Sequence, residues 1–321
     1  MHIADVIAVP GSAAYFFDDQ AAILAGAPRD GLNYPGTPLT PGFESIRQPA
    51  AAVSVLLVLS DGQVAHGDCV SVQYSGVGGR DPLLDGPGLA ARIDDEVAPA
   101  LRGRTVDRYE PFKALLADFA PLGTAAVYGL SQALLDACAR ANRCTMAQLV
   151  QREWGLDIPF KPVPVFAQTG EDRRNGVDKM ILKRVDSLPH GLINNLSLVG
   201  PDGSELVAYV GWVRDRVQAL APDTGYRPIL HFDTYATPGL AFDGDLARVT
   251  EMMLAMEQAA RPYALRVEHP VDSGGRAEQI RDFVVLRKLL ADAGSSVQIV
   301  ADEWANTVED IRAFNRAHAA E

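Results

Sequence analysis

The sequence predicts an α/β protein in two parts, an α+β region followed by a parallel (β/α) barrel. Three observations support this prediction: a β-hairpin signal near residue 60, a proline-rich break near residue 158, and acids that end successive apolar runs at a regular spacing after the break. Each observation places one part of the fold.

The N-terminal region begins with the predicted hairpin. The runs VSVLLVLS (53–60) and QVAHGDCVSVQYSG (63–76) flank Asp61-Gly62. Asp-Gly between two β-rich runs is a strong hairpin signal, because these residues suit the backbone of a tight turn. Apolar residues at three- and four-residue steps then predict helices, which cover 88–101, 112–119 and 125–142.

A boundary between two domains is predicted near residue 158. The segment GLDIPFKPVP (155–164) carries three prolines in ten residues, which prevents a helix from continuing through it. We therefore assign 1–158 to one domain and 159–321 to the other.

The second domain alternates short apolar runs with amphipathic helices. The runs end at Gln168, Asp233, Glu268 and Asp302, and the last three acids are spaced by 35 and 34 residues. Helical patterns at 204–221 and 277–294 lie between runs. This period is typical of parallel strands with crossover helices, either in a barrel or in a doubly wound sheet. No Gly-rich dinucleotide fingerprint follows any of the runs, so we favour the barrel.

Composition excludes several classes of partner. The formal net charge is -12 and the pI is near 5, whereas binding to nucleic acid or to an anionic membrane needs clustered Lys and Arg. The N-terminus has no signal-peptide pattern, and no stretch is long and apolar enough to span a bilayer. Three cysteines without a CxxC pair predict reduced thiols. These features predict a cytoplasmic protein that acts on a small molecule.

The acids at the strand ends predict a metal site. In parallel α/β folds the C-terminal ends of the strands carry the chemistry, and neighbouring strands lie about 4.8 Å apart. Asp233, Glu268 and Asp302 would therefore repel one another unless a cation lay between them, and oxygen ligands favour Mg²⁺. The alternative is that each acid caps a helix or pairs with a surface arginine. Three acids in register favour the metal.

Several longer motifs resemble one known family. These motifs are FFDDQAA (16–22), DGQVAHGDCVSVQYSGVGGRDP (61–82), PVFAQTGEDRR (164–174), LPHGLINN (188–195), HFDTYATPG (231–239), LRVEHPVD (265–272) and VADEWANTVEDI (300–311). Together they resemble methylaspartate ammonia-lyase, a member of the enolase superfamily. The resemblance implies an α+β capping domain followed by an enolase-type TIM-like barrel. It also implies the elimination of ammonia from the amino acid 3-methylaspartate to give mesaconate.

The resemblance also implies residue roles. His190 matches the second acid/base residue of the family, which also contacts the substrate, and Gln73 and Gln168 match substrate-binding amides. Asp233, Glu268 and Asp302 match the Mg²⁺ ligands, consistent with the acid spacing. A monovalent cation such as K⁺ and a homodimeric assembly are further expectations from the family. The pattern of 177–190 fits a helix or a strand, so it leaves open whether His190 precedes or follows the second strand.

Two further expectations concern particular segments. SGVGGRDP (75–82) does not match GxxxxGK[ST], so we interpret it as a mobile loop near the site rather than a phosphate loop. A barrel that begins near residue 159 would hold about five strands by residue 321, whereas complete barrels take about 250 residues.

The lysine base of the family, on the sixth strand, would then lie beyond Glu321. Three functions remain open: the lyase itself, an inactive metal-binding fragment of it, or another enolase-superfamily reaction. On this basis we expect the 321-residue chain alone to show little or no turnover.

Overall fold

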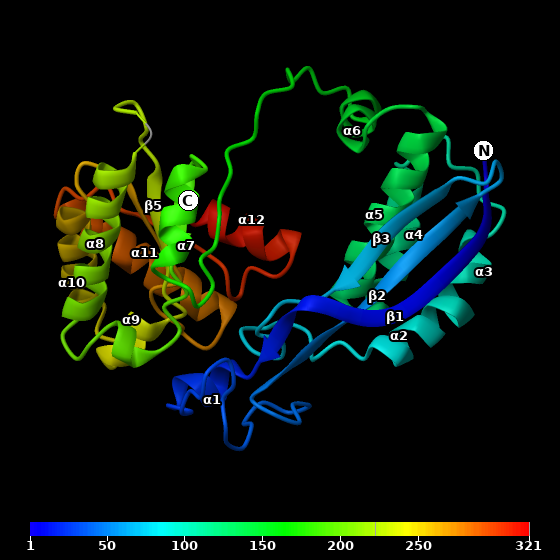
Figure 1. Cartoon of the computed structure of the whole chain (residues 1–321). Helices are drawn as coiled ribbons and strands as arrows, with labels where there is room; N and C mark the ends of the chain where they lie inside the picture. Colours follow the sequence, from blue (N-terminus) through cyan, green and yellow to red (C-terminus); the bar gives the residue numbers. More distant parts are fainter. Residues whose placement is uncertain (222, 321) are drawn as a thin grey trace. The chain divides into compact units, whose positions relative to one another are not determined.

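An antiparallel sheet and a parallel sheet form the two parts of the protein (Figure 1). The structure is a computed structural model that describes residues 1–221 and 223–320. Its two compact units are Met1–Asp19 with Arg29–Val77 and Asp81–Lys161, and Gln20–Pro28 with Gly78–Arg80 and Pro162–Glu321. The domain boundary that the sequence predicts after residue 158 remains a prediction.

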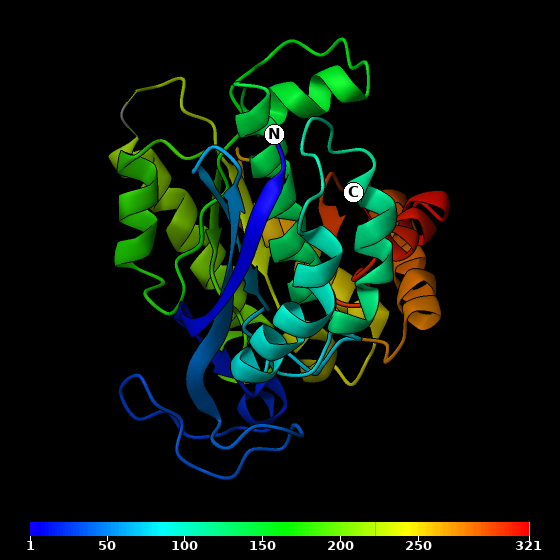
Figure 2. The same ribbon diagram turned by 90° about the vertical axis from the view of Figure 1, so that its right-hand side faces the viewer.

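The antiparallel sheet has the order β1-β2-β3. Its strands are β1 (Ile3–Asp18), β2 (Arg47–Leu59) and β3 (Val64–Val70). The predicted hairpin is confirmed: β2 pairs with β3, and Gly62 in the turn has a φ of 86° and donates its N–H to the Leu59 carbonyl at 2.9 Å. Figure 2 shows β1, in blue, running along this hairpin.

The long strand β1 was not predicted, because Pro10-Gly11-Ser12 interrupts its apolar pattern. Proline lacks an N–H and is confined in sheets to edges and bulges. Strand β1 lies at the edge of its sheet, and its pairing with β2 shifts register between Ser12 and Phe16. The edge position and the bulge explain how the strand contains this sequence.

The helices of the N-terminal region cover the antiparallel sheet. They are α2 (Gly86–Arg92), η1 (Ile93–Val97), α3 (Ala98–Leu101), α4 (Phe112–Asp118), η2 (Ala120–Leu122), α5 (Thr124–Ala141) and α6 (Met146–Glu153). The three predicted helices are confirmed, the first as the run from α2 through α3. A short helix, α1 (Gln20–Leu24), clusters instead with the second unit.

Two glycines allow α5 to approach the sheet closely. A Cβ placed on Gly67 of β3 would lie 2.1 Å from the Gly129 carbonyl oxygen, and a Cβ placed on Gly129 would lie 2.5 Å from the Cys69 nitrogen. Real Cβ atoms do not occur at such distances, so only glycine fits both positions. Helix α5 therefore packs directly on β3, which holds the hairpin in a fixed place.

The parallel sheet has the order β4-β5-β6-β7, which follows the order of the chain. Its strands are β4 (Ser187–His190), β5 (Ile229–Asp233), β6 (Leu265–Glu268) and β7 (Gln298–Val300). A parallel bridge from Phe166 to Ser187 places the preceding run, 163–168, beside β4. Sequential order without a switch point is the arrangement of a barrel wall, so the structure confirms the barrel over a doubly wound sheet.

Helices connect these strands and bury their apolar face. They are α7 (Asn175–Leu182), η3 (Leu196–Leu198), α8 (Ser204–Leu220), α9 (Thr237–Ala241), α10 (Leu246–Ala260), α11 (Arg276–Asp292) and α12 (Val308–Arg316). Helix α10 packs against both α8 and α11. Leu230, Phe232 and Val267 point toward this layer and are fully buried, so the alternate side chains of β5 and β6 are directed to the opposite face. That face carries the polar site.

Within the described residues, no helix combines the length and apolar character needed to cross a membrane.

Candidate active site

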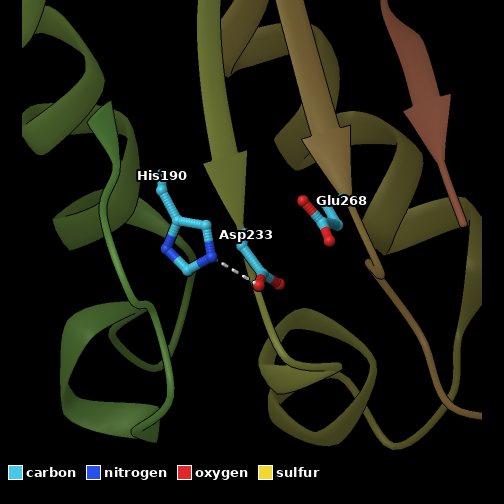
Figure 3. A group of neighbouring side chains, drawn as sticks. All are labelled: His190, Asp233 and Glu268. Carbon is cyan, nitrogen blue, oxygen red and sulfur yellow. Dashed lines mark ion pairs between the residues drawn. The ribbon is translucent and has the colours of Figure 1, made fainter. Parts of the chain in front are cut away.

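The candidate site lies at the C-terminal ends of three neighbouring parallel strands. His190, Asp233 and Glu268 are the last residues of β4, β5 and β6. Their ligand atoms all lie within 4.8 Å of one another, which makes them a possible metal-binding group among the residues that the structure describes (Figure 3). The predicted convergence of Asp233 and Glu268 is therefore observed, and His190 joins them.

The structure settles the position of His190 in the chain. Residues 175–182 form α7 and His190 ends β4, so the ambiguous segment is a helix followed by a strand. Strand register places His190 beside Phe232, on the apolar face. However, His190 has a φ of 65°, which breaks the extended alternation, and its ring reaches the polar face.

The His190 imidazole is buried and held at both nitrogens. Its Nε2 lies 2.9 Å from Oδ2 of Asp233, and its Nδ1 accepts the backbone N–H of Leu192 at 3.3 Å. The neutral ring therefore carries its proton on Nε2. Burial lowers the pKa of His190, and the charges of Glu268 and Asp302, which act in the opposite direction, do not overcome this effect. The ring therefore stays neutral at physiological pH.

Glu268 has a second histidine as its partner. Nε2 of His231 lies 2.6 Å from Oε2 of Glu268, and the His231 ring packs at a tilt against Phe166 with centroids 4.5 Å apart. His231 precedes Asp233 by two residues on β5, so the two-residue period of a strand directs both side chains to the same face. The alternation of apolar and polar residues is visible in the sequence LHFD (230–233), but we assigned His231 no role from it.

Asp302 lies two residues beyond β7 and has a different partner. Its Oδ2 is 2.8 Å from Nη2 of Arg80, and the structure does not include it in the group of His190, Asp233 and Glu268. Nη1 of Arg80 lies 3.2 Å from Glu303. From the sequence we assigned no role to Glu303 or to Arg80, since 222 residues separate Arg80 from Asp302.

A buried ion pair supports this part of the site. Oε2 of Glu303 lies 2.9 Å from Nδ1 of His269, and both side chains are buried. Burial opposes the charge of Glu303, but His269 and Arg80 lower its pKa to about 2. Burial also opposes protonation of His269, while the charge of Glu303 raises its pKa. The attraction between the two side chains thus favours a carboxylate on Glu303 and a protonated ring on His269, beside Asp302.

The acid cluster is unfavourable without a cation. Burial and the charges of Glu268, Glu303 and Asp302 raise the pKa of Asp233 well above its ordinary value. Burial and Glu303 likewise raise the pKa of Asp302, although Arg80 opposes this shift. Carboxylates arranged in this way are stabilised by a bound divalent cation, so the donor set fits a hard metal ion.

The ends of the strands also hold strained backbone. Residues other than glycine with positive φ follow or end β4 to β7, and they are His190, Leu192, Tyr235, Ala236, His269 and Trp304. Such residues cost free energy and cluster at functional sites, where the surrounding structure holds them in place. Their concentration at one edge of the sheet marks this edge as the functional one.

The two predicted glutamines lie in different compact units. Gln168 is exposed and ends the run beside β4, where the next residue, Thr169, donates its N–H to the Pro189 carbonyl at 3.1 Å. Gln73 belongs to the N-terminal unit, and its Nε2 donates to Oδ2 of the buried Asp18 at 2.6 Å. The bond to Asp18 leaves the amide oxygen of Gln73 as the acceptor to offer a ligand.

The chain matches two family models that together span almost its full length. Residues 1–155 match the model for the methylaspartate ammonia-lyase N-terminus, and residues 157–321 match the model for the C-terminus. Methylaspartate ammonia-lyase 1 of Carboxydothermus hydrogenoformans is 44% identical over 99% of this chain and 77% of its own length.

Solved structures agree with this likeness. A crystal structure of Citrobacter amalonaticus methylaspartate ammonia lyase containing (2S,3S)-3-methylaspartic acid is 45% identical, with a TM-score of 0.94 over 100% of this chain and 79% of its own. A Mg complex of β-methylaspartase from Clostridium tetanomorphum is 44% identical, with a TM-score of 0.88 over 99% of this chain and 78% of its own. Muconate cycloisomerase from Pseudomonas fluorescens, at 18% identity and a TM-score of 0.57, shares the fold alone.

Proposed function

The chain belongs to the methylaspartate ammonia-lyase family and is a carbon–nitrogen lyase, and we propose that it converts 3-methylaspartate to mesaconate and ammonia. The observation that carries this proposal is the convergence of His190, Asp233 and Glu268 at neighbouring strand ends. A relative at 45% identity contains (2S,3S)-3-methylaspartic acid, which supports the choice of substrate.

The reaction requires removal of a poorly acidic proton. A base takes the proton on C3, the C–H electron pair forms the C2–C3 double bond, and the C2–N bond breaks so that ammonia leaves with its electron pair. Loss of the proton places negative charge on the adjacent carboxylate. The protein must therefore supply a proton acceptor and positive charge near that carboxylate.

We propose that Asp233, Glu268 and Asp302 hold Mg²⁺. The raised pKa of Asp233 supports a cation in this place, and the Clostridium tetanomorphum relative at 44% identity is a Mg complex. When bound, Mg²⁺ supplies the positive charge that stabilises the developing negative charge of the substrate carboxylate. Asp302 contacts Arg80 through Oδ2, so it would take part through its other oxygen, Oδ1.

A second set of ligands is the observed group of His190, Asp233 and Glu268. Imidazole is a common ligand of zinc and other transition metals, whereas Mg²⁺ takes oxygen ligands. The three carboxylates therefore suit Mg²⁺ better, which leaves His190 to handle a proton.

We propose that His190 acts as an acid/base residue through Nε2. Its ring is kept neutral by burial, so it is able to accept a proton near pH 7. For Nε2 to accept a proton, the neutral ring must carry its own proton on Nδ1. Nδ1 then no longer accepts the hydrogen bond from the backbone N–H of Leu192. The distance from the Leu192 nitrogen to Nδ1 is 3.3 Å, beyond the usual range for a hydrogen bond. Moving the ring proton to Nδ1 therefore breaks only a weak hydrogen bond.

The amides Gln73 and Gln168 are proposed to bind the substrate. An amino acid presents an ammonium group that donates and carboxylates that accept, and a primary amide serves both. Because Gln73 gives its Nε2 to Asp18, its oxygen suits the ammonium group. The exposed Gln168 at the end of its run has both amide atoms to offer.

Three expectations beyond the chemistry stay part of this proposal. Three free cysteines support a reducing compartment, and we propose the cytoplasm. A homodimer and a supporting monovalent cation such as K⁺ rest on the family resemblance.

The proposed reaction is tested with the protein at the length that its gene encodes. Given 3-methylaspartate and Mg²⁺, we expect equal amounts of mesaconate, followed by its ultraviolet absorbance, and ammonia. A chelator should stop both. Exchange of the C3 proton with solvent deuterium, or epimerisation, without ammonia release would instead support another enolase-superfamily reaction.

A further inference from the structure

Three residues of the N-terminal half belong structurally to the C-terminal unit. Gly78–Arg80 clusters with the parallel-sheet unit, whereas the residues on both sides, up to Val77 and from Asp81, cluster with the antiparallel-sheet unit. They lie in the SGVGGRDP loop, to which the proposed reaction assigns no role. This segment is the subject of the inference.

The backbone of the segment holds the turn that carries Asp302. The carbonyl oxygen of Gly78 accepts the backbone N–H of Trp304 at 3.1 Å and the side-chain amide of Asn306 at 2.9 Å. Residues 301–306 contain no helix or strand, so their position depends on such contacts. One carbonyl therefore fixes the turn at two points just after Asp302.

Both glycines are required for this approach. Gly78 and Gly79 have φ values of 61° and 77°, which L side chains rarely adopt. A Cβ on Gly78 would lie 2.6 Å from Cγ of Glu303, and a Cβ on Gly79 would lie 2.9 Å from Nδ2 of Asn306. A side chain at Gly78 would meet the buried Glu303, and one at Gly79 would displace the Asn306 amide that donates to the Gly78 carbonyl, so either would disturb contacts between the segment and the turn.

Arg80 adds a charged contact to the same turn. Its Nη1 is 3.2 Å from Glu303, which is buried and paired with His269, so the guanidinium has a fixed support. Its Nη2 is 2.8 Å from Oδ2 of Asp302, whose side chain is 38% exposed. The planar fork of arginine thus fixes the partly exposed Asp302 relative to the buried Glu303.

We propose that Gly78–Arg80, the clasp, positions Asp302 for metal binding. The proposal rests on the proposed role of Asp302 as a Mg²⁺ ligand. Partners that orient a metal ligand typically change metal affinity by about 10–100-fold when they are altered. The clasp orients the ligand from a segment that is more than 200 residues away in sequence.

The test separates position from charge. Gly79→Ala changes no charge but displaces the clasp, and we expect calorimetry to show Mg²⁺ binding that is weaker by about 10–100-fold. The matched control is Gly244→Ala, since Gly244 has a φ of 76° in the same compact unit and nothing within 4 Å of an added Cβ. Its φ is nearly the same as that of Gly79, but the added Cβ meets no neighbour, so its Mg²⁺ affinity should stay that of the unmodified protein.

A second variant keeps the backbone unchanged. Arg80→Lys retains the positive charge but cannot bridge Asp302 and Glu303 with a planar fork, so it should also weaken Mg²⁺ binding. Arg276→Lys, at an exposed ion pair with Asp310 in the same unit, serves as its control. Circular dichroism and a thermal melt verify that each variant is folded.

The outcomes distinguish the clasp from the metal site itself. If Asp302→Asn abolishes Mg²⁺ binding while Gly79→Ala and Arg80→Lys bind as the unmodified protein does, the clasp is wrong and the metal site stands. Tighter binding in both variants would show that Arg80 competes with the metal, which also overturns the proposal. Unchanged binding in Asp302→Asn would overturn the assignment of Asp302, and with it the clasp.

Discussion

Replacing Asp233 with asparagine is expected to weaken Mg²⁺ binding by more than about 100-fold, beyond the range typical of residues that only support a ligand. The substitution keeps the shape of the side chain and removes the negative charge at the centre of the acid cluster. Asp233 is buried and lies with His190 and Glu268 in the candidate metal-binding group, so the substitution removes a charge from the interior of the site. Calorimetry with Mg²⁺ measures the effect directly.

Two further substitutions complete this experiment. Asp215→Asn, at a side chain that is 62% exposed on α8, should leave Mg²⁺ binding unchanged. His190→Gln should also retain most of the binding if the ligands are the three carboxylates. Loss of binding in His190→Gln together with full binding in Asp302→Asn would instead assign the metal to the group of His190, Asp233 and Glu268.

In the protein at the length that its gene encodes, replacing His190 with glutamine is expected to slow the reaction of one C3 epimer of 3-methylaspartate by about 10²–10⁴-fold, the usual contribution of an acid/base group. Glutamine keeps a hydrogen-bond donor for Asp233 but cannot accept a proton near pH 7. Two bases on opposite faces of the substrate would serve opposite epimers, so the other epimer should react at nearly the original rate. Initial rates with each epimer measure this difference.

The comparison between epimers separates chemistry from stability. A histidine that only supports the fold would affect both epimers equally, and an equal loss would show that His190 is structural. His66→Gln is a suitable control, because the His66 side chain is 64% exposed and pairs only weakly, at 3.7 Å, with Asp136. It should leave both rates unchanged.

The regular part of the site could be predicted from sequence. Asp233 and Glu268 end β5 and β6 as expected, because a constant βα period brings equivalent positions of parallel strands to the same edge. The register confirms this, since Asp233 pairs directly with Glu268. The local sequence pattern and the order of the strands are together enough to predict the positions of site residues that lie within regular strands.

The irregular part of the site was beyond such reasoning. The ring of His190 reaches the polar face through a positive φ, and periodicity carries no information about that angle. Asp302 lies past the end of β7 in a turn, where its direction is determined by Arg80 rather than by the strand. Contacts between residues far apart in sequence depend on the whole fold, so no local pattern indicates them.

The proline in β1 bears on self-association. Strand β1 is an edge of its sheet, and Ile7 and Val9 on it are 40% and 47% exposed, a combination that invites another chain to add a strand. Pro10 follows directly and has no N–H to offer an incoming strand. The register shift between Ser12 and Phe16 also makes the next part of this edge irregular, which disfavours pairing with another chain. The residue that concealed β1 in the sequence thus acts as a gatekeeper against aggregation through this edge.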